Sequence, residues 1–249
     1  MVANIKLSEK QCPAAEQAAV MAAEQRWFRS IIASFIYLVL WTRPDMAYAV
    51  SKLCKFMHNP GHDHIIALKR LLRYLLATAN YGLIYDFSPS AASTKKTGFY
   101  GYYDASHADC PDTMKSTLAY LFFFEGCAIS WNSKLHTVIT TSTNHSEYCA
   151  AAKAVKEAKS IEKVAIEVGM SRYVHPIDLF SDSRGCIAMT YNLTLCSGRP
   201  PSILTWRTTT LESSRSWVRS NHYLLRRHQG HDGGPADQAS GPGRFLAPR

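Results

Sequence analysis

The sequence lacks several features that would place the protein outside the cell or in a membrane. Its seven cysteines include no C-x-x-C pair, and their odd number argues against a disulfide framework or a structural zinc site. The N-terminus, MVANIKLSEK, has no apolar run of the kind that a secretory signal needs. The longest apolar run, Ile31 to Trp41, is shorter than the roughly 20 residues that cross a bilayer. We therefore expect an intracellular protein, cytoplasmic or nuclear, that is not secreted and not inserted in a membrane.

Acidic residues are also few, since 19 Asp and Glu stand against 28 Lys and Arg and give a formal charge of +9. This balance favours an anionic partner, either nucleic acid or a membrane surface. The sequence has no glycine-rich loop of the kind that holds nucleotide phosphates. All lysines lie at or before Lys163, whereas ten of the fifteen arginines follow it. The last 51 residues, 199–249, have neither lysine nor apolar periodicity, so they do not look like a continuation of the same folded protein.

The hydrophobic pattern divides the remaining chain into a helical part and a mixed part. Helices are predicted over residues 14–41, 45–57 and 63–77, and Pro44 separates the first two. Strands are predicted at 83–85, 98–103, 116–124 and 127–131, and residues 138–141 either continue or follow the last of these. A long helix, a strand at 177–180 and a helix at 184–191 follow. Hairpins followed by a crossover helix indicate an α/β fold with a mixed sheet.

The long helix lies within Thr140 to Gly169 and presents a core-facing stripe at steps of three and four residues. The stripe consists of Tyr148, Ala151, Ala152, Val155, Ala158, Ile161, Val164, Ala165 and Val168. Four lysines (153, 156, 159 and 163) occupy much of the opposite surface. Glu147 is predicted on the first turn. There it would complete a capping box with Asn144 as N-cap, or it would hold a metal ion.

Two aspartates support the metal interpretation of Glu147. Asp104 follows the predicted strand 98–103, and Asp182 follows the strand 177–180. Ligands of α/β sheets gather at strand ends and at the helix starts beside them. Three carboxylates there would suit Mg²⁺, and two such ions support in-line phosphodiester hydrolysis. Taken singly, however, Asp104 and Asp182 have an ordinary interpretation as turn or N-cap residues.

Two further pairs carry weaker signals. His145 and Cys149 are spaced to share one helix face, as a Cys/His nucleophile pair would, but no third orienting residue is evident. His107 and Cys110 have loose metal-ligand spacing without a second pair, which disfavours zinc.

The order and spacing of several motifs resemble the end of a Ty1/copia-type retrotransposon polyprotein, where reverse transcriptase is followed by an RNase H domain. The matching segments lie between Trp27 and Asn192 and include TRPD, LRYL, GYYDASHADCPDTMKST, ISWNSKLHTVITTSTNHSEYCA and LFSDSRGCIAM. The resemblance implies a helical end of reverse transcriptase over 1–86, without the polymerase site. It also implies an incomplete RNase H-like domain over 92–196 and an out-of-frame, disordered tail over 197–249.

The resemblance also implies an activity and a site. Asp104, Glu147 and Asp182 fall where the family's metal carboxylates lie, so Mg²⁺ or Mn²⁺ is the expected cofactor. The expected reaction is hydrolysis of the RNA strand in RNA–DNA hybrids, recognised by duplex shape, backbone and 2′-OH. The expected partners are such a hybrid, or another nucleic acid, and the rest of the Pol polyprotein.

The chain departs from the family pattern in ways that predict impaired activity. The family pattern at Asp104 is Asp-Ala-Asp, and here Ser106 occupies its second acidic position. The helix entry carries His145 where the family has an acidic residue. Reading Pro201 to Glu212 out of frame gives KHIDVAHHYTR, and a different shift after Arg219 yields a stretch ending ADQLTKPL. Both are family motifs, so at least two indels or wrong exon joins are inferred. The fourth carboxylate would lie in that second stretch, and Asp237 is not its equivalent. The alternative is a non-enzymatic nucleic-acid-binding or scaffold relic.

Overall fold

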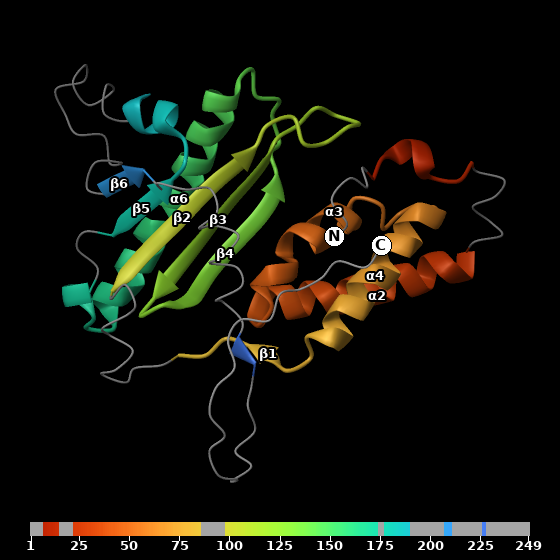
Figure 1. The fold of residues 1–249 in the computed structure, drawn as a ribbon, viewed down its shortest axis with the longest axis horizontal. Helices are drawn as coiled ribbons and strands as arrows, with labels where there is room; N and C mark the ends of the chain where they lie inside the picture. Colours follow the sequence, from red (N-terminus) through yellow and green to blue (C-terminus); the bar gives the residue numbers. More distant parts are fainter. Residues whose placement is uncertain are drawn as a thin grey trace, which may run out of the picture.

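The computed structural model describes residues 7–14, 22–85, 98–173 and 177–189, together with the backbone of 207–210 and 226–227. Figure 1 shows a twisted sheet with one long helix across its far face, and a group of helices beside the edge of that sheet. The predicted α/β class with a mixed sheet and flanking helices is confirmed.

The helical group consists of α2 (Ala22–Trp41), the 3₁₀ turn η2 (Pro44–Met46), α3 (Ala47–Cys54) and α4 (His62–Ala77). Its core residues recur at helical spacing and are buried: Phe28, Ile32, Phe35, Met46, Val50, Leu53, Ile65, Leu68 and Leu71. The predicted helices are confirmed, although α3 ends at Cys54 rather than at residue 57. Residues 15–21 of the first predicted helix lie outside the described residues.

The segment Thr42-Arg43-Pro44, which separates α2 from α3, also makes a buried contact with the end of α4. Arg43 is almost fully buried and donates to both carboxylate oxygens of Asp45, at 3.0 and 2.9 Å. It also donates to the carbonyl and the hydroxyl of Thr78 at the end of α4, at 3.0 and 2.6 Å. A buried guanidinium needs such partners to offset its desolvation. The TRPD sequence therefore ties the turn after α2 to the far end of α4.

The sheet is formed by β2 (Phe99–Ser106), β3 (Thr117–Phe124), β4 (Cys127–Leu135), β5 (Asp178–Ser181) and β6 (Arg207–Thr210), in the order β4-β3-β2-β5-β6. The first three strands are antiparallel, and β5 and β6 run parallel to β2. Glu125 and Gly126 form a two-residue hairpin turn with φ of +48° and +77°, as a tight primed turn requires.

Two strand predictions were wrong. Residues 138–141 do not continue a strand, because β4 ends at Leu135 and a loop leads from there to the helix. The short strand predicted at 83–85 lies instead at β1 (Tyr81–Gly82), which pairs with β7 (Arg226–Arg227). Short apolar runs carry no periodicity that fixes their ends, which explains both errors.

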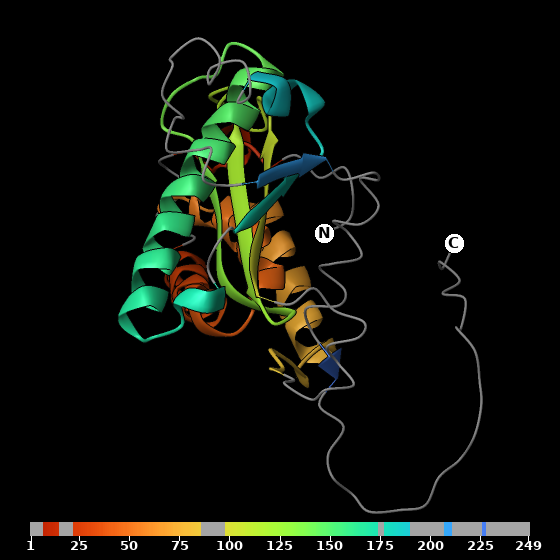
Figure 2. The same ribbon diagram turned by 90° about the vertical axis from the view of Figure 1, so that its left-hand side faces the viewer.

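The long helix α6 (Thr143–Glu167) covers one face of the sheet, as Figures 1 and 2 show. Its buried side is lined mainly by alanines (150, 151, 154, 158 and 165), whose small side chains let the helix approach the strands closely. The predicted stripe was too wide, because Val164 and Val168 are 58 % and 62 % exposed. Apolar spacing alone does not distinguish a buried position from one at the border of the contact.

The helical group packs against the sheet part at β4 and at the loop after β2. The indole of Trp131 in β4 donates to the carbonyl of Val39 in α2 at 2.7 Å. Lys52 of α3 forms an ion pair with Asp109, whose carboxylate also accepts from the Thr117 hydroxyl at 2.5 Å. These contacts place α3 beside the loop that leaves the strand carrying Asp104.

Within the segment predicted to be a disordered tail, 197–249, the structure describes only the backbone of β6 and β7. Those six residues are paired as strands, whereas the rest of the segment, including Asp237, lies outside the described residues. The predicted domain boundaries at residues 86, 92 and 196 also fall outside them and stay predictions. In the described part of the chain, no helix is long and apolar enough to cross a membrane.

Candidate metal centre

Asp104, Glu147 and Asp182 come together at one edge of the sheet. One carboxylate oxygen from each lies within 4.8 Å of the others. The strand register explains this meeting, because β2 and β5 are parallel neighbours with Tyr102 opposite Phe180. Asp104 and Asp182 each lie two residues beyond that pair, so they reach the same level of the sheet. The three residues singled out from the sequence therefore form one cluster.

Glu147 enters this cluster from α6, and its role in the helix differs from the predicted one. Ser142, not Asn144, is the N-cap, and its hydroxyl accepts from the His145 amide at 3.1 Å. Glu147 is therefore beyond the first turn and forms no capping box with Asn144, so that prediction was wrong. Since the cap does not use the Glu147 carboxylate, this side chain is available to the cluster.

The electrostatics of the cluster favour a bound cation. Burial, followed by the charges of Asp104 and Asp182, raises the pKa of Glu147 to about 8. Burial and Asp182 also raise the pKa of Asp104, partly opposed by a hydrogen bond from the Ala105 amide. Carboxylates held this close resist simultaneous ionisation unless a positive charge joins them. Cation binding would remove that penalty.

The orientation of the Glu147 carboxylate supports the same conclusion. Its Oε2 is withdrawn from solvent and has no hydrogen-bond partner among the described residues. A buried, unpaired carboxylate oxygen is costly and calls for a ligand. Three carboxylate oxygens are the hard donors that Mg²⁺ and Mn²⁺ prefer, with water and substrate phosphate completing the coordination. The residues present therefore fit a divalent metal ion.

The segment after β5 packs against the start of α6. Residues 184–189 are helical, and Gly185 lies against the start of α6, where a Cβ would stand 2.7 Å from Asn144 Oδ1. A side chain at position 185 would require the exposed Asn144 side chain to move aside. Cys186, the next residue, contacts the hydroxyl of Tyr103 at 3.9 Å.

The other predicted pairs are not assembled into sites. His145 is exposed, and its Nδ1 contacts the Thr141 hydroxyl at 3.3 Å rather than Cys149. His107 contacts Thr140, and Cys110 is buried. Among the described residues, the three carboxylates are the only group of three or more His, Cys, Asp and Glu that could hold a metal ion.

A buried polar cluster beside the site was not anticipated. Ser116 and Thr140 are almost inaccessible, and their hydroxyls are 2.6 Å apart. The Ser116 hydroxyl accepts from the Ala108 amide at 3.1 Å. The loop after Asp104 is thereby tied to the segment that enters α6. Ordinary serine and threonine residues in loops give no sequence signal for such a role.

Comparison with known proteins identifies the family. The chain is 35 % identical over 193 residues to the retrovirus-related Pol polyprotein from transposon TNT 1-94 of Nicotiana tabacum. It is 33 % identical over 165 residues to the corresponding polyprotein from transposon RE1 of Arabidopsis thaliana. The homologues of this chain are retrovirus-related Pol polyproteins from copia-type transposons.

The copia-type relationship covers most of this chain and little of the relatives. The matched region is 77 % of the chain but 14 % of the TNT 1-94 polyprotein, and 66 % of the chain but 11 % of the RE1 polyprotein. The chain is also 39 % identical to the secreted RxLR effector protein 161 of Plasmopara viticola, over 53 % of this chain and 88 % of that protein. No protein-family model and no solved structure matches the chain.

Proposed function

We propose that this copia-type Pol fragment carries an RNase H-like site that hydrolyses the RNA strand of RNA–DNA hybrids with Mg²⁺ or Mn²⁺. The observation that supports this most is the convergence of Asp104, Glu147 and Asp182 within 4.8 Å. The similarity to Pol polyproteins from transposons also supports this proposal. The rest of such a polyprotein is the proposed context in which the fragment acts.

The proposed roles follow from the position of each carboxylate. Asp104 and Glu147 are partly buried and would form the inner wall of the metal site, whereas Asp182 is exposed and borders the side that admits substrate. When bound, divalent ions supply a lowered water pKa and stabilise the charge on the leaving oxygen. Without cations, the negative charge of the cluster would repel a phosphodiester brought close to it, so the cations would also help to place the scissile phosphate.

Glu147 gives the metal-free site a particular protonation state. Because burial and its acidic neighbours raise its pKa to about 8, Glu147 holds a proton at pH 7. Cation binding releases that proton, so metal affinity should increase as the pH rises towards 8. This coupling is a property of the chain itself and can be measured without any substrate.

We further propose that hydrolysis is slow. Ser106 and His145 stand where the family pattern is acidic, and both are exposed. Neither donates a carboxylate, and a protonated His145 would add positive charge beside the cations. A site with three carboxylates holds its metals more weakly than one with four.

The rival function is non-enzymatic binding of nucleic acid, which the formal charge of +9 favours. A cleavage assay of the purified chain on a labelled RNA–DNA hybrid, with Mg²⁺ or Mn²⁺, separates the two. The nuclease proposal predicts slow cleavage that Asp104→Asn abolishes and that Asp63→Asn, an exposed change on α4, leaves intact. Hybrid binding without cleavage, or cleavage that persists in Asp104→Asn, contradicts it.

A further inference from the structure

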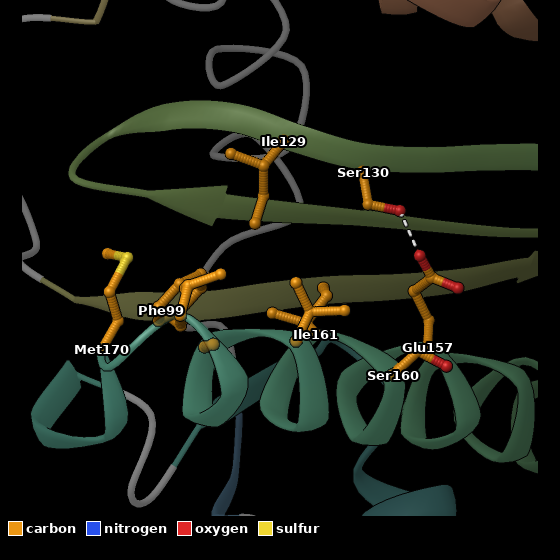
Figure 3. Close-up of a pocket in the computed structure, with 10 residues that line it drawn as sticks. Phe99, Ile129, Ser130, Glu157, Ser160, Ile161 and Met170 are labelled. Carbon is orange, nitrogen blue, oxygen red and sulfur yellow. Dashed lines mark hydrogen bonds between the residues drawn. The ribbon is translucent and has the colours of Figure 1, made fainter.

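One border of α6 faces β4, the outer strand of the sheet. Glu157 and Val164 line a cleft together with Ile129 and Ser130, and the Ser130 hydroxyl donates to Glu157 Oε1 at 2.5 Å (Figure 3). Residues at steps of four and seven share one side of a helix. Lys153, four residues before Glu157, therefore lies on the same border, one turn closer to the carboxylate site.

Lys134 comes to this border from the strand. Alternate residues of a strand share a face, so Lys134 faces the same way as Ser130. Its partner in β3 is Leu118, which belongs to the core beneath α6. Lys134 is exposed and Lys153 half-buried, and the charge of Lys134 acts on Lys153, so the two side chains lie near each other.

The cleft changes character along its length. The end away from the carboxylates is apolar and is lined by Phe99, Ile129, Ile161, Val168 and Met170 (Figure 3 labels all but Val168). Towards the carboxylates the cleft is lined by Ser130 and Glu157. Lys134 and Lys153 lie beyond these two residues, and exposed Lys156 lies on the next row of α6. We call Lys134, Lys153 and Lys156 the cationic strip.

The positive charge of the strip is not neutralised within the described residues. The two ion pairs found among the described residues, Arg43–Asp45 and Lys52–Asp109, include none of the three lysines of the strip. Burial, and then the nearby Lys134 ammonium, lower the pKa of Lys153. The pKa of His136 is lowered by burial and by the charge of Lys153. Like charges held together in this way favour an anionic ligand.

We propose that the cationic strip binds the phosphate backbone of a nucleic-acid duplex whose scissile phosphate lies at the carboxylate site. Lys153 is six residues after Glu147, or about 9 Å along the helix axis at 1.5 Å per residue. This distance corresponds to roughly three base pairs at 3.4 Å each. One duplex can therefore contact the strip and the carboxylates together. Identification of that duplex as an RNA–DNA hybrid rests on the proposed function.

The test compares two double variants that remove the same charge. Lys134→Gln/Lys153→Gln changes the two lysines of the strip nearest the cleft, whereas Lys159→Gln/Lys163→Gln changes exposed lysines further along α6, away from the carboxylates. Fluorescence anisotropy with an 18-base-pair RNA–DNA hybrid, in EDTA and over a salt series, measures affinity without cleavage. Each lost phosphate contact reduces the slope of log affinity against log salt concentration by about 0.9. The slope of the strip variant should therefore be smaller than that of wild type by about 2. We expect an affinity loss of about tenfold or more at 0.1 M salt for the strip variant, and less than twofold for the control.

Equal losses in the two variants would overturn the proposal, because charge alone would then explain them. It would also be overturned if only vesicles containing phosphatidylserine, and no duplex, bound the strip. The proposed function can fail separately. If the hybrid binds through the strip but is not cleaved with Mg²⁺, the nuclease proposal is refuted and the proposal for the strip still holds. Cleavage with an unchanged KM in the strip variant refutes the strip and leaves the nuclease intact.

Discussion

Replacement of Glu147 with glutamine should stabilise the metal-free protein at alkaline pH. Glutamine keeps the shape of the side chain and removes the charge that Asp104 and Asp182 repel. The pKa of Glu147 is raised from 4.5 to about 8. A group with a raised folded-state pKa contributes stability that is fully present below the unfolded pKa and is lost as the pH rises through the folded pKa. The wild-type chain should therefore lose stability between pH 4.5 and 8, and Glu147→Gln should lose less.

The magnitude follows from the size of the shift. A shift of roughly 3.5 pKa units would correspond to about 5 kcal/mol for a fully buried group, at 1.36 kcal/mol per unit. The site opens to solvent beside Asp182, and solvent screening reduces this to about 2 kcal/mol. We expect Glu147→Gln to exceed wild type by that amount at pH 9 and to differ little at pH 5. In thermal unfolding, about 2 kcal/mol corresponds to roughly 4–8 °C for a chain of this size.

Urea unfolding in EDTA at pH 5 and pH 9 measures the effect, with Glu167→Gln as the matched control. Glu167 is an exposed residue at the end of the same helix, so its replacement should change stability equally at both pH values. Addition of Mg²⁺ at pH 9 should stabilise wild type and leave Glu147→Gln nearly unchanged. The reasoning is refuted if Glu147→Gln is less stable than wild type at pH 9. It is also refuted if the substitution changes the free energy of unfolding by the same amount at both pH values.

Three further predictions concern the fold that holds the site. Gly101→Ala in β2 should cost about 2–3 kcal/mol in urea unfolding, because its Cβ would stand 2.6 Å from an aromatic ring of β3. Gly82→Ala, which has nothing within 4 Å, should be nearly neutral, and equal costs would contradict the account. Lys52→Met should cost about 2 kcal/mol, since it leaves a partly buried aspartate unpaired, whereas exposed Lys69→Met should cost almost nothing. Arg43→Met should cost about 3 kcal/mol and lower the melting temperature, and a change below 1 kcal/mol would show that the buried network is dispensable.

The sequence predicted the fold class and the cluster because both depend on local patterns. Asp182 follows β5 as predicted, but the prediction that a strand ends before Asp104 was wrong, because β2 continues to Ser106. The cluster still forms, because parallel β2 and β5 bring both aspartates to the same level of the sheet. The cap of α6 was assigned wrongly because Ser142 and Asn144 are both good N-caps and only the loop path from β4 decides between them. Tertiary packing also decides the exposure of Val164 and the partner of Lys52, and neither has a local signature.

The most direct test of the account is calorimetric titration of Mn²⁺ into the purified chain at pH 8, with Asp104→Asn and Asp63→Asn measured alongside. We predict that wild type and Asp63→Asn bind Mn²⁺ with the same affinity, that this affinity weakens at pH 6, and that Asp104→Asn weakens it at least tenfold. Equal affinities in the three proteins would show that the cluster of Asp104, Glu147 and Asp182 is not a metal site.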